Sequence, residues 1–195
     1  MELAKKNTLT WIAITLVLFP ILLLVGLFLR LVQGNTLGAA REWFYPMMTL
    51  HGVGMVGVAY VGGMACIERV LAKYTKPSSL VSLFAIVGTV IGVLLLLASV
   101  FLGKFAAGWY FLYPLPLKGN WPTWSTIVFL LCITVLGATW LVWCLDLLRA
   151  IAKQYSLPKA LGWHYLAGKT EPEVPPAIII STVSLIAAVA CLLAG

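Results

Sequence analysis

The chain has 195 residues, of which 62% are hydrophobic and 10% are charged. A soluble domain carries about 25% charged residues, so this chain has too little polar surface to cover a water-facing globule. Its net charge of +7 comes from basic residues scattered among the expected loops, which argues against nucleic-acid binding and suits a membrane protein whose loop charges set its orientation. The composition therefore excludes a soluble enzyme and predicts an all-α integral membrane helix bundle.

Five apolar stretches are long enough to cross a bilayer, which needs about 20 residues of helix. The five predicted spans cover residues 8–32, 44–71, 80–102, 124–151 and 176–194. The last opens with Pro175 and Pro176, and proline suits the first turn of a helix. The polar segments between the spans are shorter than a soluble domain of about 50 residues. We therefore expect a single membrane domain over residues 1–195 with five transmembrane helices.

The basic residues fall unevenly on the two sides of these spans. Nine of the 13 lysines and arginines lie on the side of the N-terminus, and four lie on the opposite side. The nine are Lys5, Lys6, Arg69, Lys73, Lys76, Arg149, Lys153, Lys159 and Lys169, and the four are Arg30, Arg41, Lys104 and Lys118. Since basic loops stay in the cytoplasm, this bias predicts a cytoplasmic N-terminus and an external C-terminus.

The two histidines differ in kind. His51 lies inside the second span, seven residues after Phe44, which is roughly 10 Å below the outer edge by helical rise. An ionisable residue inside a span points to function by default. Asp146, near the inner end of the fourth span, is the one acidic residue that we assign to a span, and it lies at the far side. His164 lies in the loop between the last two spans, where we expect it to be solvated.

The chemistry of His51 leaves two interpretations open. Histidine is the commonest metal ligand, and heme iron is often held by a histidine. A polar histidine hydrogen-bonded to a backbone carbonyl is the structural alternative. The adjacent Gly52 is equally open, because glycine allows close helix packing in membranes and also clears space for a flat macrocycle. The four cysteines lie in apolar stretches without a C-x-x-C pair, which favours small core residues.

Three segments of the sequence, at residues 45–53 (YPMMTLHGV), 109–121 (WYFLYPLPLKGNW) and 145–149 (LDLLR), carry a resemblance to one membrane-protein family. Residues 45–53, with a histidine–glycine pair after Thr-Leu, resemble the helix-two motif of subunit I of the heme–copper oxygen reductases, in which this pair follows Thr-Leu or Thr-Met. Residues 109–121 (WYFLYPLPLKGNW) resemble the outer loop between helices three and four, and its Lys-Gly-x-Trp ending looks most like the B-type branch. Residues 145–149 (LDLLR) resemble the inner end of helix four in the same branch. One departure is that Leu115 separates the two loop prolines.

This resemblance covers the chain from Thr8 onward and implies a role for His51. In the family, this histidine is one axial ligand of a low-spin heme. The resemblance implies that Gly52 and Met55 lie beside the macrocycle. It also implies that loop aromatics pack near the heme propionates; the alternative, which the residue types alone favour, is that they anchor the chain at the membrane interface. These aromatic residues are Trp109, Tyr110, Tyr113 and Trp121.

The family's complete subunit has at least twelve helices, and this chain resembles the first five. The second heme ligand and the copper site come from later helices, so we expect a split subunit I that is an enzyme only as part of a multi-chain oxidase. Expected partners are a second polypeptide with the remaining helices, a copper-bearing subunit II, and cytochrome c or quinol as electron donor, in the cell membrane of a prokaryote. Alternatives are a heme-free structural or assembly subunit of a respiratory complex, or a component of a nitric oxide reductase.

Overall fold

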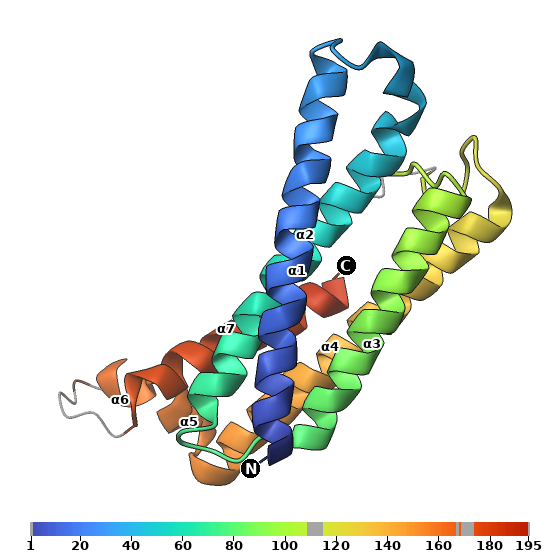
Figure 1. Ribbon diagram of the computed structural model, residues 1–195. Helices are drawn as coiled ribbons and strands as arrows, with labels where there is room; N and C mark the ends of the chain where they lie inside the picture. The colour runs from blue at the N-terminus through green and yellow to red at the C-terminus, as the bar shows by residue number, and fades with distance from the viewer. Residues whose placement is uncertain (1, 109–114, 167, 169–173, 195) are drawn as a thin grey trace. The chain divides into compact units, whose positions relative to one another are not determined.

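The computed structural model describes residues 2–108, 115–166, 168 and 174–194. Over these residues the secondary structure is helical (Figure 1). The long helices are α1 (Glu2–Gln33), α2 (Phe44–Leu71), α3 (Ser79–Leu97), α4 (Thr123–Gln154) and α7 (Pro176–Ala194). The short ones are η1 (Gly38–Trp43), the π-helix η2 (Ala98–Leu102), α5 (Leu157–Ala160) and α6 (Trp163–Leu166).

Among the described residues, five helices are long and apolar enough to cross a membrane, which confirms the predicted all-α membrane bundle. Their apolar surface is also exposed to a degree that water would not tolerate. Leu16, Leu80 and Ile180 are 67%, 71% and 67% exposed, respectively. Such side chains suit a lipid solvent, in which the bilayer rather than a protein core receives them. The chain is therefore a multi-pass membrane protein.

The helix boundaries follow the predicted spans with small differences at the ends. The second and fifth spans agree with α2 and α7, and the third continues from α3 through η2. Helix α1 begins at Glu2 instead of Thr8. Its polar first turns have a fixed contact, because the Asn7 side-chain amide donates to the Ser79 carbonyl at 2.8 Å and Asn7 is buried.

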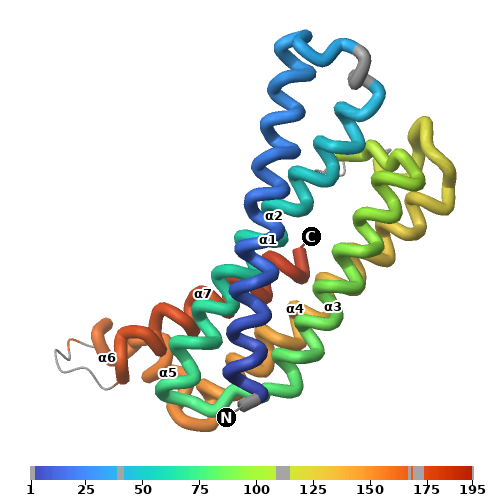
Figure 2. The backbone as a smooth tube through the Cα atoms, in the orientation of Figure 1, coloured from blue at the N-terminus to red at the C-terminus, as the bar shows by residue number. Residues whose placement is uncertain are grey.

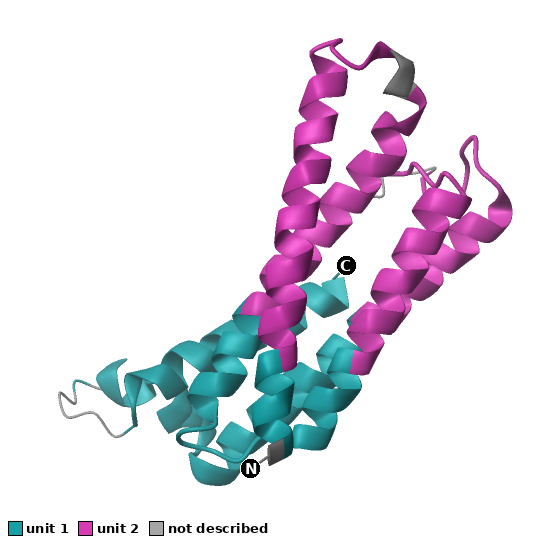
Figure 3. Cartoon of the chain, in the orientation of Figure 1, with its two compact units in different colours: residues 1–9, 63–86, 137–195 teal, residues 10–62, 87–136 magenta. Residues whose placement is uncertain are grey.

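The chain folds into two compact units (Figure 3). Unit 1 comprises residues 1–9, 63–86 and 137–195, and unit 2 comprises residues 10–62 and 87–136. Helices α1 to α4 each contribute residues to both units. The single membrane domain over residues 1–195 stays a prediction.

Unit 2 contains two antiparallel helix pairs. Residues of α1 and α2 meet in opposite chain order, because Leu22 contacts Gly54 and Thr15 contacts Gly62. In the second pair, α3 meets α4 closely at Gly92, where an added Cβ would lie 2.3 Å from Leu136 Cδ2. Small residues that let helix backbones approach are the usual packing device in membranes.

Unit 1 joins the first turns of α1 and α3 to the C-terminal part of α2, the greater part of α4, and α5 to α7. The backbone reverses between α2 and α3 over residues 72–78 (Figure 2). The core of unit 1 includes Leu71, Leu147, Ile178 and Leu185, all fully buried. Cys144 also lies in this core, with its Sγ 3.8 Å from the Met64 Sδ. Cys132 and Cys144 are buried and unbridged, which agrees with the predicted packing role. Cys66 and Cys191 are exposed on membrane-spanning helices, so the prediction of core residues is wrong for these two.

Candidate heme-ligand site

His51 lies on α2 against α1, within unit 2. Its Nδ1 is 2.8 Å from the Leu22 carbonyl oxygen. A carbonyl oxygen can only accept, so Nδ1 carries the hydrogen and donates it to Leu22. In the neutral imidazole the other nitrogen, Nε2, then holds a lone pair. His51 is half-buried, so part of its side chain is accessible from outside the unit.

Two glycines make this hydrogen bond possible. A Cβ atom on Gly26 would lie 2.8 Å from His51 Cε1, closer than real Cβ contacts allow, so the ring fills the space that a side chain would take. A Cβ atom on Gly54 would lie 2.6 Å from Leu22 Cδ2. The missing side chains bring α1 and α2 together at this level, and the close approach puts the Leu22 carbonyl within reach of the imidazole.

The segment after η2 is fixed to α2 two residues before His51. Thr49 is fully buried, and its hydroxyl donates to the Tyr45 carbonyl at 3.1 Å. The same oxygen accepts the backbone N–H of Gly108 at 2.9 Å. One threonine therefore satisfies a buried backbone donor and holds this segment against the helix that carries His51.

A pocket of about 530 Å³ lies at the N-terminal end of α2, with Tyr45, Met48, Lys104, Asn120 and Trp121 in its lining. Its volume is within the roughly 300–1,000 Å³ range of small-molecule sites. At its rim Lys104 lies 3.4 Å from the Glu42 carboxylate and 5.0 Å above the Trp43 ring. The pocket thus combines an apolar wall with one exposed ion pair.

Trp121 is held in place by its neighbours rather than loosely anchored. Its indole N–H donates to Thr126 Oγ1 at 2.8 Å, and its ring packs edge-on against Phe105 at 4.9 Å. The Phe105 ring in turn stacks on Phe129 at 4.3 Å. A Cβ atom on Gly119 would lie within 2.1 Å of the Trp121 ring, so the glycine is required there.

The predicted site residues are therefore described in part. His51, Gly52 and Met55 are half-buried on α2. Trp121 lies in the pocket lining with Met48 and Tyr45, which are about one and two turns before His51 on α2. His51 itself is not part of that lining. Trp109, Tyr110 and Tyr113 lie outside the described residues.

Within the described residues, no three His, Cys, Asp or Glu side chains gather as a metal-ion site.

Sequence reasoning missed a second acidic residue inside a span. The prediction that Asp146 is the one acidic residue within the spans is therefore wrong. Glu68 lies in α2, is 8% exposed, and accepts the Trp143 indole N–H at 2.6 Å in unit 1. The signal was present in the sequence, since Glu68 lies within the span predicted for residues 44–71. Its partner on α4 was invisible, because the two residues are 75 positions apart.

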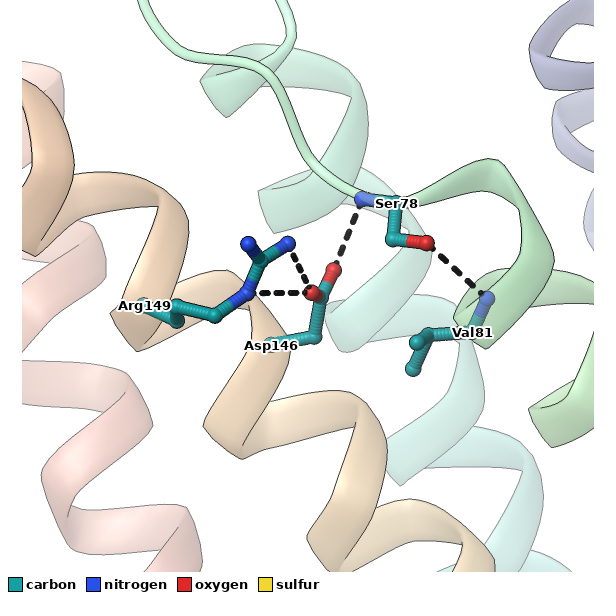
Figure 4. Close-up of polar contacts among 4 residues, drawn as sticks. All are labelled: Ser78, Val81, Asp146 and Arg149. Atoms are coloured by element: carbon teal, nitrogen blue, oxygen red, sulfur yellow. Dashed lines mark hydrogen bonds and ion pairs between the residues drawn. The ribbon is translucent and has the colours of Figure 1, made fainter.

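Asp146 joins two elements of unit 1 (Figure 4). Its Oδ2 accepts the backbone N–H of Ser78 at 2.8 Å, directly before α3. Its Oδ1 accepts from Nε of Arg149 at 2.9 Å and from Nη2 of the same residue. Ser78 also caps α3, because its hydroxyl accepts the N–H of Val81 at 3.4 Å. This carboxylate thus links α4 to the residue that directly precedes α3.

His164 is not solvated as predicted. It lies in α6, is 7% exposed, and neither ring nitrogen has a hydrogen-bond partner among the described residues. Its ring lies 4.2 Å from the Tyr165 ring. The error arose because a loop position predicts exposure, whereas here a short helix packs the residue inward.

Comparisons with protein-family models, with curated proteins and with solved structures found no match to this chain.

Proposed function

We propose that this chain is a heme-holding membrane subunit of a terminal respiratory oxidase, with His51 as one axial ligand of a low-spin heme. One observation carries the proposal: inside a membrane span, the Nδ1–H of His51 is bound to the Leu22 carbonyl at 2.8 Å, which leaves Nε2 as the ligand atom. Metal-binding histidines usually donate their other N–H in this way, which fixes the ring plane and raises the basicity of the ligand nitrogen.

The neighbouring residues support the same role. Gly26 leaves room for the Cε1 edge of the imidazole, so the ring lies against α1 while Nδ1 donates to the Leu22 carbonyl. Gly52 has no side chain to cover the ring from the next position of α2. A heme bound at Nε2 would supply one-electron redox chemistry, and this chain would hold and orient the ligand nitrogen.

The ligand count makes the proposed subunit part of a larger assembly. The resemblance implies a low-spin heme with two histidine ligands, whereas this sequence has two histidines and only His51 in a span. We therefore include in the proposal a second polypeptide that supplies the other ligand and the oxygen-reducing heme–copper centre, with copper in partner chains only. Cytochrome c or quinol would donate electrons, by way of a copper-bearing subunit where cytochrome c is the donor.

A heme-free structural subunit is the alternative. The hydrogen bond to Leu22 favours it too, because that bond by itself satisfies the one N–H of a neutral histidine within a helix pair. In this case His51 would pack α1 against α2 and would take no part in electron transfer. A nitric oxide reductase component would share the His51–heme arrangement and differ in the partner chains.

One spectrum distinguishes the heme-holding subunit from the heme-free structural subunit. The complex that contains this chain would be purified with His51→Ala, with His164→Leu as the matched histidine control, and reduced-minus-oxidised spectra recorded. We expect His51→Ala to lose the low-spin heme band and His164→Leu to keep it. A folded His51→Ala complex with the full low-spin band would leave the structural alternative standing and eliminate the heme-ligand role.

A further inference from the structure

Two long-range hydrogen bonds hold the ends of four helices together in unit 1. The Asn7 side chain at the start of α1 donates to the carbonyl of Ser79, the first residue of α3, at 2.8 Å. The N–H of Ser78 donates to Asp146 in the C-terminal part of α4, also at 2.8 Å (Figure 4). The turn at residues 72–78 joins the end of α2 directly to α3. The first turns of α1 and α3 and the last turns of α2 and α4 therefore lie at one end of unit 1 (Figure 3).

This end of unit 1 carries a group of exposed basic side chains. They are Lys5 on α1, Arg69 on α2, Lys73 and Lys76 in the turn, and Lys153 on α4. We call these five residues the basic cluster, and none of them has an ion-pair partner among the described residues. Among the side chains that the structure describes in unit 1, the acidic ones are Glu68 and Asp146, and both are buried. Arg149 is left out of the cluster, because Asp146 already pairs with it.

The basic cluster lies at the level of the lipid headgroups. Arg69 and Lys153 belong to the last turns of two membrane-spanning helices, and Lys73 and Lys76 follow directly in a short turn. A bilayer of about 40–45 Å with a hydrocarbon core of about 30 Å leaves roughly 5–8 Å for each headgroup layer. The long stems of lysine and arginine carry their charges from a helix end into this layer. Tyr74, between the two turn lysines, is 39% exposed, and tyrosine is enriched at the same level of a membrane.

We propose that the basic cluster binds the headgroups of anionic phospholipids, with Lys73 and Lys76 in the turn as its centre. Groups of about four to eight basic residues directly beside a membrane-spanning helix are typical of such binding. A lipid fits better than an acidic protein, because the five charges are divided among helix ends inside the layer that headgroups occupy. Orientation during insertion needs only the charges of the unfolded chain, whereas this binding is a property of the folded unit. It is independent of His51 and of the proposed heme.

The experiment titrates the purified full chain in detergent with lipid. Phosphatidylglycerol and phosphatidylcholine with the same acyl chains would be compared by native mass spectrometry. We expect preferential retention of phosphatidylglycerol, which glycerol phosphate without acyl chains does not displace. Lys76→Gln should weaken this retention about 5-fold, the equivalent of about 1 kcal/mol, and Lys73→Gln added to it should weaken it further. Lys76→Arg should bind as the wild type does, because the charge remains.

A double variant of unit 2 is the charge-matched control. Arg30→Gln with Lys118→Gln removes two exposed basic residues outside the cluster. The net charge therefore changes by as much as in the double variant of Lys73 and Lys76. We expect the control to retain phosphatidylglycerol as the wild type does. A higher concentration of ammonium acetate should weaken the retention by the wild type, because salt screens exposed charges. Thermal transitions of all variants establish that each is folded.

Several results would overturn the proposal. Equal retention of the two lipids by the wild type would eliminate the anionic headgroup as the ligand. Unchanged retention by the folded double variant of Lys73 and Lys76 would eliminate the basic cluster, and an equal loss in the control would reduce the effect to net charge. If the isolated chain retains phosphatidylglycerol but its purified complex does not, a partner protein covers the cluster, and the lipid proposal is also wrong.

Discussion

At the scale of single residues, the position of His51 depends on an absent side chain. Gly26 on α1 leaves the space into which the imidazole edge fits, and the hydrogen bond to Leu22 follows from that fit. The sequence pattern pointed to His51 from its place in a span. It could not point to Gly26, because the distance between these residues is set by the crossing of two helices and not by spacing along one of them.

Gly26→Ala should destabilise the protein. The new methyl group would lie 2.8 Å from His51 Cε1, so either the ring or α1 must move. Overpacking of this kind costs about 1–3 kcal/mol, and thermal unfolding in detergent would measure it. Gly63→Ala is the matched control, because a Cβ atom there meets nothing within 4 Å. Alanine is favoured over glycine in a helix by about 0.5–1 kcal/mol, so Gly63→Ala should be neutral or stabilising. Equal stability of the two variants would contradict the fit described for His51.

At the scale of helices, the five spans could be predicted because each is a long apolar run, a property of local sequence alone. The polar contacts between helices could not be predicted in this way. Glu68 meets Trp143, and Ser78 meets Asp146, across 75 and 68 positions of sequence. Nothing in a single sequence records such pairs. The start of α1 was missed for the same reason, since Asn7 is held by Ser79 of another helix.

The Glu68–Trp143 bond should couple α2 to α4 within unit 1. Trp143→Phe removes the indole donor and leaves a buried carboxyl oxygen without it, which costs about 1–3 kcal/mol. Glu68→Leu removes the acceptor. A double-mutant cycle with both changes should give a coupling free energy of about 0.5–3 kcal/mol, measured by unfolding in mixed micelles. Additive effects within about 0.5 kcal/mol would mean that the 2.6 Å contact contributes no stability.

At the scale of the whole molecule, five spans place successive loops on alternating sides of the membrane. The side that holds the N-terminus is predicted from charge, and the fold alone does not choose it. The turn at residues 72–78 and the segment that begins α5 belong to unit 1, together with the start of α1. The turn after α1 and the segment before α4 belong to unit 2.

The predicted orientation has a direct test in intact cells. In a variant with all four native cysteines replaced, single cysteines at exposed positions would be treated with a membrane-impermeant maleimide. Leu37→Cys and Lys118→Cys should react from outside, whereas Lys76→Cys and Ser156→Cys should react only after the cells are opened. The reason is the excess of basic residues in the loops that contain Lys76 and Ser156, which keeps those loops in the cytoplasm. The reverse labelling pattern would invert the orientation and move His51 to the cytoplasmic side, and labelling of all four positions in intact cells would contradict a five-span topology.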